Sequence, residues 1–386
     1  MKLCIVGGKL QGLEAVYLAK KAGIEAVLID MDPEPPAQGI ADEFHCINVL
    51  HNAEVIEIIR GCDGILPANE NRETLVFLEA IAGKMGIPYF QDNNAFWISS
   101  DKSKSKALFD SLQIPQPKHW PECGFPVIVK PAAMSGSVGI HKVKSRIELD
   151  KAVQEVSLID KKIIIQKYID GLALSLELIS LNGNVVPLQI TELEFDEEYG
   201  CKRVIAPDAA SESSRRLFIE ISKKIASGLK LKGLTDTQAI VDDKGVPLII
   251  EINARLPSQT PTTVLHSSGI NMVQLLADVY ANNKLPNLKA EPKKAVIFEH
   301  IKVAGNMISV KGEHIIGESK NLRLEKGFLG ADEAITNLSK NDKVGVATLI
   351  IKEDSRDKAY VKLAKVIENI KSEFKLINYK DPVPQL

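Results

Sequence analysis

Polar residues at alternate positions mark the first segment that could do chemistry, the sequence IIEINAR. Side chains on a strand alternate between its two faces, so Glu251, Asn253 and Arg255 share one face. The preceding strand offers Asp236 and Gln238, also two residues apart, and the intervening turn DDKG predicts a hairpin. Carboxylate and amide oxygens suit Mg²⁺, and a guanidinium suits the phosphate oxygens that such an ion bridges. The hairpin is a candidate magnesium and phosphate site, the alternative being a polar strand that faces solvent.

A lysine beside a loop of small residues forms the second candidate, in the sequence FPVIVKPAAMSGSVGI. Lys130 ends an apolar strand, where a buried lysine is costly unless it meets an anion. The loop that follows can turn successive backbone N–H groups toward a phosphate. Its candidate binding residues are Ser135, Gly136, Ser137 and Val138. A plain exposed turn after a strand is the alternative.

Two further segments place backbone groups where a ligand can bind. The sequence VGGKLQG follows a strand and opens a helix, as a relaxed dinucleotide fingerprint does. Leu10 and Gln11 in this turn are candidate substrate residues, and the turn binds a second nucleotide, a substrate or nothing. In the sequence IIIQKYIDG, backbone groups can meet an adenine edge between Tyr168 and Ile169, although the segment alone is more typical of core.

The elements that must position these residues indicate an α/β fold. At the N-terminal end, short β-branched runs alternate with helical segments, the pattern of βαβ units on a parallel sheet. Pro115 and Pro117 then stop a helix, and strands in an α+β pattern follow. We predict a Rossmann-like domain over residues 1–98, a small central α+β subdomain over 99–176 and a larger α+β domain over 177–386.

The composition excludes several classes of function. Lys and Arg number 48 against 50 Asp and Glu, which leaves no basic surface for nucleic acid and no polybasic membrane anchor. The longest uncharged stretch, residues 256–277, contains Pro, Ser, Thr and Gln, so it is no transmembrane helix. The start of the chain lacks the features of a signal peptide, and the five cysteines form no CxxC pair. We expect a cytoplasmic protein with free, mostly buried thiols.

Taken together, the motifs resemble the ATP-grasp superfamily of carboxylate–amine ligases over residues 101–276. Within it, the sequences VGGKLQG, LPANEN, SSDKSKSK and above all RLPSQTPTTVLHSSGIN are most similar to the 3-methylornithine:L-lysine ligases of pyrrolysine biosynthesis. The resemblance implies the ATP-grasp fold, ATP, one or two Mg²⁺ ions with Mn²⁺ as a substitute and, as in many members, a homodimer. It also implies amide formation between 3-methyl-D-ornithine and the ε-amine of L-lysine.

The resemblance assigns roles to individual residues. Lys102 and Lys130 match the two phosphate-binding lysines, and Glu251 and Asn253 match the metal pair. Arg255 matches an arginine that steadies a phosphate or the tetrahedral intermediate, so Lys130 and Arg255 are the catalytic candidates. The positions that match the adenine-binding hinge are Gln166, Lys167, Tyr168 and Ile169.

Two positions depart from the pattern of the superfamily. Gln238 stands where many relatives carry an acidic metal ligand, although carbamoyl-phosphate synthetases are similar to this chain in using Gln. Asp236 on the same face is the residue that can compensate. The ribose-binding acid of D-alanine:D-alanine ligase aligns with Ala173, and Glu177 is the candidate substitute.

The chemistry that follows is formation of an acyl phosphate and attack on it by an amine, for which the sequence identifies no base. Such a site needs carboxylates for the ammonium groups of two diamino acids, and a loop that excludes water. Glu70 lies just past the carboxyl end of a strand, where open α/β sheets bind ligands, and Asn71 is beside it. Ser258, Gln259 and Thr260 follow the metal strand and can hold a substrate carboxylate or amine.

Three alternatives remain open at the level of sequence. The chain can be a different ATP-grasp ligase, or a nucleotide-binding regulatory module that no longer turns over, as Gln238 alone suggests. It can also be an NAD-dependent dehydrogenase built on VGGKLQG, which leaves Lys130 and Glu251 unexplained. The acidic segment TELEFDEEYG, residues 191–200, is either a solvated loop or a substrate contact, and His266 is a helix-start or core residue.

Overall fold

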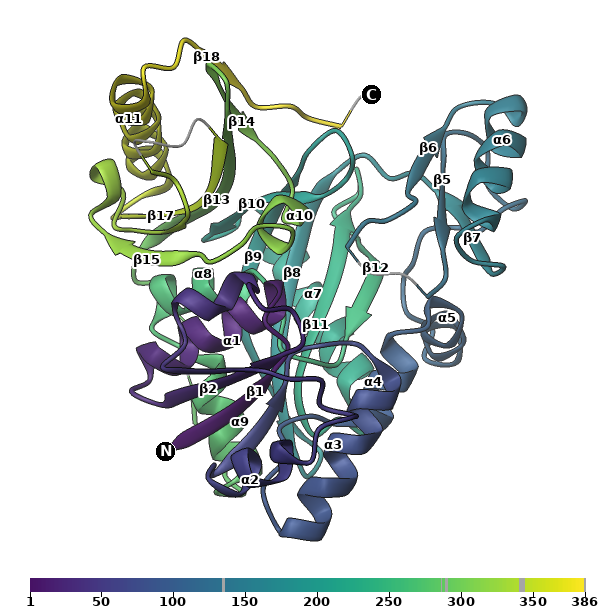
Figure 1. The fold of residues 1–386 in the computed structure, drawn as a ribbon. Coiled ribbons are helices and arrows are strands. Elements are labelled where there is room, and N and C mark those ends of the chain that lie inside the picture. The colour runs from purple at the N-terminus through teal and green to yellow at the C-terminus, as the bar shows by residue number, and fades with distance from the viewer. Residues whose placement is uncertain (134–135, 286, 289–290, 340–343, 385–386) are drawn as a thin grey trace.

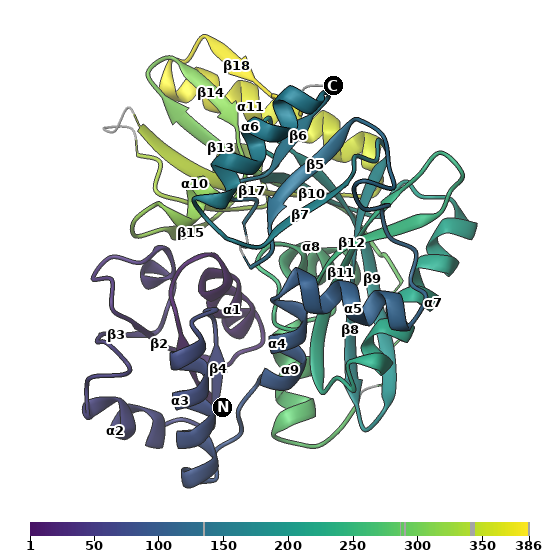
Figure 2. The same cartoon turned by 90° about the vertical axis from the view of Figure 1, so that its right-hand side faces the viewer.

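The computed structural model describes residues 1–133, 136–285, 287–288, 291–339 and 344–384. Its strands form three sheets (Figure 1). In Figures 1 and 2, helix α11 (Arg356–Phe374) and strand β18 (Asn378–Lys380) lie at the end of the molecule opposite the N-terminal unit. Within the described part of the chain, every helix is too short or too polar to cross a lipid bilayer.

The N-terminal unit is a parallel sheet of four strands in the order β3-β2-β1-β4, as βαβ units predict. Its strands are β1 (Lys2–Val6), β2 (Glu25–Asp30), β3 (Glu43–Cys46) and β4 (Gly64–Pro67). Its helices are α1 (Leu10–Lys21), the 3-10 helix η1 (Pro36–Gly39), α2 (Glu54–Arg60), α3 (Arg72–Met85) and α4 (Asn93–Ser99). The apolar runs of β1 and β2 are buried, as parallel strands covered on both faces must be.

A small antiparallel sheet in the order β6-β5-β7 follows. Its strands are β5 (Val127–Pro131), β6 (His141–Val143) and β7 (Ile163–Lys167), and its helices are α5 (Lys102–Ser111) and α6 (Arg146–Ser157). Helix α6 buries Leu149 and Val156 against Val127 and Val129 of β5. Asp101 caps α5 by accepting from the backbone N–H groups of the first turn, which places Lys102 at the first helical position.

Among the described residues, the third sheet has eleven strands, nine of them in the path β12-β11-β8-β9-β10-β13-β17-β16-β15; β14 pairs with β13, and β18 pairs with β14. Its first strands are β8 (Leu172–Leu181), β9 (Asn184–Phe195), β10 (Cys201–Ala206), β11 (Gly233–Val241) and β12 (Pro247–Asn253). The later strands are β13 (Ala295–Ala304), β14 (Met307–Val310), β15 (Arg323–Lys326), β16 (Glu333–Thr336), β17 (Val344–Glu353) and β18. The remaining helices are α7 (Glu212–Gly228), α8 (Thr260–Ser268), α9 (Met272–Tyr280), α10 (His314–Gly317) and η2 (Phe328–Gly330).

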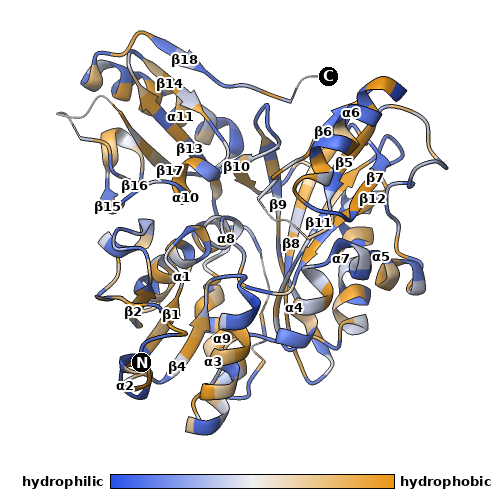
Figure 3. Cartoon of the chain, turned by 45° about the vertical axis from the view of Figure 1, so that its right-hand side comes forward, coloured by the Kyte–Doolittle hydropathy of each residue, from blue (hydrophilic) through white to orange (hydrophobic). Residues whose placement is uncertain are grey.

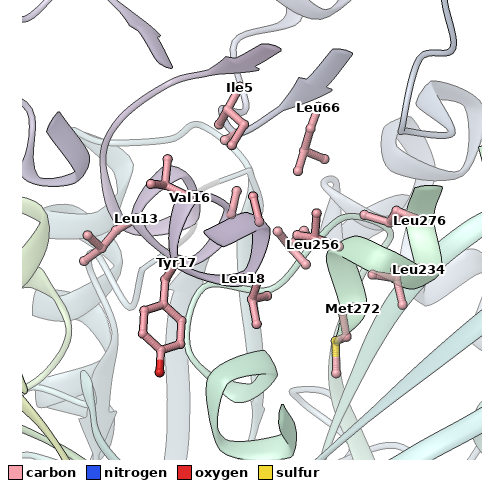
Figure 4. Close-up of a cluster of buried hydrophobic side chains, with 14 of the residues drawn as sticks. Ile5, Leu13, Val16, Tyr17, Leu18, Leu66, Leu234, Leu256, Met272 and Leu276 are labelled. Carbon is pink, nitrogen blue, oxygen red and sulfur yellow. The ribbon is translucent and has the colours of Figure 1, made fainter. Parts of the chain in front are cut away.

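One hydrophobic cluster joins the N-terminal unit to the large sheet (Figure 4). Val16 and Leu18 of α1 pack in the same cluster as Leu256, Met272 and Leu276, which belong to the segment after β12 and to α9. Figure 3 shows hydrophobic residues concentrated along the strands, as such packing requires. The core therefore holds the glycine turn before α1 in a fixed relation to the end of β12.

The acidic segment differs from its prediction. The sequence predicts that the strand ends near Ile190, but residues 191–195 complete β9. Thr191 is fully buried, and Glu192 is 7% exposed and accepts a hydrogen bond from the distant Arg356. The five cysteines are free thiols, and Cys4, Cys62 and Cys201 are buried.

Candidate functional site

The β11–β12 hairpin brings the predicted metal residues together. Its register pairs Gln238 with Glu251 and Asp236 with Asn253. Asp236 Oδ2 accepts hydrogen bonds from Gln238 Nε2 at 2.9 Å and from Asn253 Nδ2 at 3.2 Å. Each amide thus turns its NH₂ group to Asp236, which leaves both amide oxygens for a cation. Together with the Glu251 carboxylate they form an all-oxygen donor set that fits Mg²⁺.

Asp236 itself lies below this donor set. It is 2% exposed, and its other carboxylate oxygen accepts a hydrogen bond from Ser175 Oγ at 2.6 Å. The sequence offered Asp236 as a metal ligand, but its position is that of a residue that orients the two amides.

Two lysines flank Glu251. Lys102 Nζ lies 3.2 Å from Glu251 Oε1, and Lys130 is 8% exposed with its Nζ 3.4 Å from the carbonyl oxygen of Ile250. Burial lowers the pKa of Lys130 to about 8, although the charge of Glu251 acts in the opposite direction. Burial acts to raise the pKa of Glu251, but attraction to Lys102 and Lys130 brings it below its usual value. An anion that entered here would meet one buried cation and one partly buried cation.

The lysines open into a cavity of about 490 Å³, called here the hinge cavity, between the small sheet and the large one. Its volume is in the range of small-molecule sites. Apolar side chains such as Ile128, Ile240 and Ile250 form much of its wall, which suits a flat aromatic base. The predicted residues that line it are Lys102, Lys130, Gly136, Ser137, Val138, Gln166, Lys167, Tyr168, Ile169, Gln238 and Glu251.

A second cavity of about 530 Å³, called here the junction cavity, lies between the N-terminal unit and the end of β12. The predicted residues that line it are Leu10, Gln11, Glu70, Gly136, Ser137, Val138, Asp236, Gln238, Glu251, Asn253, Arg255, Ser258, Gln259 and Thr260. The two cavities share Gln238, Glu251 and residues 136–138. The strand β12 ends at Asn253, so Arg255 lies just beyond it and not on the strand as the alternation predicts. Arg255 Nε donates to Glu70 Oε1 at 2.8 Å, an ion pair that joins the segment after β12 to the loop after β4.

Residues 136–138, called here the flap, sit where the cavities meet. Gly136 and Ser137 have φ values of +66° and +60°, which favour glycine. Ser137 accepts that backbone conformation and donates its Oγ–H to the carbonyl oxygen of Tyr199 at 2.7 Å. The flap is thereby tied to the loop between β9 and β10. Ser135, predicted as part of the same loop, lies outside the described residues.

Two predicted site residues, Glu177 and Asn71, line neither cavity within the described part of the chain. Glu177 is fully buried on the interior strand β8, where burial and the neighbouring Asp236 raise its pKa. Asn71 is the N-cap of α3 and accepts from the backbone N–H of Thr74 at 2.9 Å.

Several residues that line the cavities were predicted from the sequence only as part of the acidic segment 191–200, or not at all. Tyr199, Glu192 and Glu194 reach the hinge cavity, as do the C-terminal residues Val383 and Pro384. Glu192 and Glu194 lie in the acidic segment, for which the sequence allowed either a solvated loop or a substrate contact, so the run of acids was a usable signal. The sequence gives no signal for Val383 and Pro384, because only folding brings the C-terminal segment to the hinge cavity.

Comparison with known proteins identifies a matching family model and similar proteins. A family model described as the D-ala D-ala ligase C-terminus matches residues 104–279. A 3-methyl-D-ornithine–L-lysine ligase from Methanosarcina mazei is 38% identical over 81% of this chain and 81% of that protein.

Two solved structures are similar in fold. A biotin carboxylase complex with β,γ-ATP from Campylobacter jejuni has a TM-score of 0.75, 19% identity and coverage of 95% of this chain and 91% of that one. An L-amino acid ligase from Bacillus licheniformis has a TM-score of 0.70, 18% identity and coverage of 95% and 97%. With the fold of these ATP-grasp enzymes and 38% identity over most of its length, the chain belongs to the family of 3-methyl-D-ornithine–L-lysine ligases.

Proposed function

We propose that this enzyme uses ATP to join the carboxylate of 3-methyl-D-ornithine to the ε-amine of L-lysine, through an acyl phosphate, with release of ADP and phosphate. The observation that carries the proposal is the wall common to the two cavities, formed by Glu251, Gln238 and the flap. A nucleotide in the hinge cavity and an amino acid in the junction cavity would meet there. The names of the relatives support the choice of substrates.

Different residues of the hinge cavity bind different parts of ATP. The apolar wall and the hinge residues Gln166, Lys167, Tyr168 and Ile169 take the base, and Lys102 and Lys130 take the phosphates. Glu251, Gln238 and Asn253 would hold one or two Mg²⁺ ions, or Mn²⁺ as a substitute, which neutralise phosphate charge during transfer.

In the reaction, a substrate carboxylate in the junction cavity attacks the γ-phosphate. Lys130, buried and facing the same wall, stabilises the charge that builds up on the transferred oxygens. The amine then attacks the acyl carbon and phosphate leaves, while Arg255 donates to the oxyanion. Glu70, released from Arg255, is placed to receive a substrate ammonium group, and Ser258, Gln259 and Thr260 contact the rest of the amino acid.

Water must be kept from an acyl phosphate, and the flap is the segment placed to do so. Leu10 and Gln11 close the opposite wall of the junction cavity. The domain boundaries after residues 98 and 176, the homodimer and the cytoplasmic location stay predictions.

Release of ADP by the purified protein tests the proposal. ATP and Mg²⁺ are supplied with D-ornithine, as a surrogate, and L-lysine, each alone and both together, and product mass is read in parallel. We expect ADP and an ornithyl-lysine mass only when both amino acids are present. Turnover with a different pair would reassign the substrates, and tight ATP binding without turnover on any pair would contradict the ligase function.

A further inference from the structure

A buried carboxylate in the junction cavity has no role in the mechanism above. Glu313, the residue before α10, lines that cavity and is 9% exposed. Among the described residues, its Oε2 has no hydrogen-bond partner. A carboxylate oxygen removed from water without a partner is costly, so its retention in a ligand cavity calls for a physical explanation.

A second unfilled acceptor lies beside the first. Gln259, which lines the same cavity, is 8% exposed, and its side-chain amide lies near the Glu313 carboxylate. The Gln259 Oε1 atom also lacks a hydrogen-bond partner within the described structure. Two residues that line the cavity therefore carry a carboxylate and an amide oxygen that are both buried and both without a hydrogen-bond partner in the described structure.

The wall is held rigidly. Asp196 accepts from the backbone N–H groups of Gly312 at 2.7 Å and Gly200 at 3.0 Å, which joins the segment before Glu313 to the β9–β10 loop. Gly312 and Gly200 pack so closely that a Cβ on Gly312 would lie 2.6 Å from the Cα of Gly200. The same loop carries the Tyr199 carbonyl that binds the flap. Glu313 is thus fixed in place before a ligand enters.

The pair of oxygens defines the chemistry of the ligand. Two acceptors, one of them charged, complement an ammonium group, which offers three N–H donors and no acceptor. Burial, together with the nearby charge of Asp196, raises the pKa of Glu313 to about 7. A bound cation would oppose that shift and favour the ionised carboxylate.

We propose that Glu313 and Gln259 bind an ammonium group of a diamino-acid substrate, and so select substrates that carry a second amine. This inference rests on the proposed function. Glu313 comes before α10, whereas the metal residues lie on β11 and β12, so an ammonium held at Glu313 binds on a different element from the metal-bound phosphates. It is a non-reacting ammonium, either the α-ammonium of lysine or one of those of the ornithine.

Glu313→Gln combined with substrate analogues tests this pairing. Each analogue lacks one ammonium: 6-aminohexanoate replaces lysine, and D-norvaline or 5-aminopentanoate replaces D-ornithine. For the wild-type enzyme, we expect the loss of the recognised ammonium to lower kcat/KM about tenfold or more, as loss of a charged hydrogen bond does. In Glu313→Gln, kcat/KM for the full substrates should already be lowered by that factor. The one analogue that lacks the recognised ammonium should then lower it little further. Additive losses with all three analogues would overturn the inference.

Matched controls separate a specific contact from a general effect of charge or of folding. Glu318→Gln removes an exposed carboxylate from the same cavity, and an equal effect there would show a general field rather than a specific contact. The KM for ATP should be unchanged in Glu313→Gln, and its melting temperature reports folding. If that variant does not fold, Glu313→Asp, which keeps the charge but shortens its reach, is taken through the same analogues. A wild-type enzyme that forms no amide at all would instead refute the proposed function.

Discussion

At the scale of single residues, the orientation of two amides decides whether the hairpin can bind a cation. Gln238 and Asn253 can present either oxygen or NH₂ to the cavity, and only the oxygen is a metal ligand. Asp236 accepts from both NH₂ groups and so selects the productive orientation. A neutral Gln at position 238 is therefore compatible with a metal site, because a buried carboxylate beneath it sets its direction.

Asp236→Ala should weaken the response of the enzyme to Mg²⁺. Without the shared acceptor, both amides are free to rotate, and loss of such supporting groups costs about 10- to 100-fold in metal affinity or activity. The measurement is the Mg²⁺ concentration that gives half-maximal thermal stabilisation by ATP, repeated for ADP release. Asp243→Ala, in the exposed turn of the same hairpin, is the control. Equal Mg²⁺ requirements in both variants would contradict the orienting role.

At the scale of elements, the site depends on contacts that join segments from different units. Helix α1 is tied to the start of α8 because Glu14 Oε1 accepts from the backbone N–H of Thr262 at 2.5 Å. The flap is tied to the β9–β10 loop through Ser137. Both contacts lie between segments far apart in sequence, so each can be removed without deleting an element.

Glu14→Gln should reduce the fall in stability with rising pH. Burial raises the pKa of Glu14 from its ordinary value of 4.5 to about 8, against the hydrogen bonds from Thr262. Between those values the folded state holds a proton that the unfolded state has lost, so the contribution of Glu14 falls as pH rises. The free energy of unfolding is measured with denaturant at pH 5 and pH 8. From the lower to the higher pH, that of the variant should rise relative to that of the wild type by on the order of 1 kcal/mol or more. Glu25→Gln, an exposed carboxylate, should show no comparable gain, and parallel behaviour of the two would count against this reasoning.

Ser137→Gly should uncouple ATP hydrolysis from amide formation. Glycine accepts the positive φ at this position, so the variant loses only the hydrogen bond to the Tyr199 carbonyl. A looser flap admits water to the acyl phosphate, and we expect the ratio of ADP to amide to rise from about one to about two or more. Tyr199→Phe keeps the backbone carbonyl and is the control. An unchanged ratio in Ser137→Gly would exclude the flap contact as a barrier to water.

At the scale of the whole molecule, the end of the chain returns to the site. Lys202, 1% exposed, donates to Asp381 Oδ1 at 2.5 Å and to the carbonyl oxygen of Pro382 at 2.6 Å. Arg203 donates to the other oxygen of Asp381 at 2.7 Å. These bonds hold Val383 and Pro384 against the hinge cavity. The C-terminal segment thus contributes to the nucleotide wall as well as to the fold.

Asp381→Ala should destabilise the protein and weaken ATP binding together. The variant leaves the buried Lys202 ammonium with one acceptor fewer, and breaking a buried pair costs about 2–4 kcal/mol after allowance for the partial exposure of Asp381. Urea unfolding and the KM for ATP measure the two effects. Glu212→Gln, in an exposed pairing with Arg216 on α7 away from the tail, should cost about 1 kcal/mol or less. Losses no larger than this control would contradict a structural role for the tail.

The sequence predicted the parts of this molecule whose signals are local. Alternation placed Glu251 and Asn253 on one face, and a lysine at the end of an apolar strand identified Lys130. Glu313 left no such signal, because its partners lie near positions 200 and 259 and meet only in the fold. The burial of Glu177 also left no local signal: the resemblance matches the ribose-binding acid to Ala173, Glu177 was the nearby substitute, and its burial between β11 and β9 is a property of the sheet.

Transfer of oxygen from the substrate tests the central mechanism most directly. The reaction is run with D-ornithine carrying ¹⁸O in both carboxylate oxygens, together with L-lysine, ATP and Mg²⁺, and the products are read by mass. Attack of the carboxylate on the γ-phosphate predicts one ¹⁸O in inorganic phosphate, one in the amide and ADP as the nucleotide product. Label in AMP, or phosphate without label, would contradict an acyl phosphate formed at the wall between the two cavities.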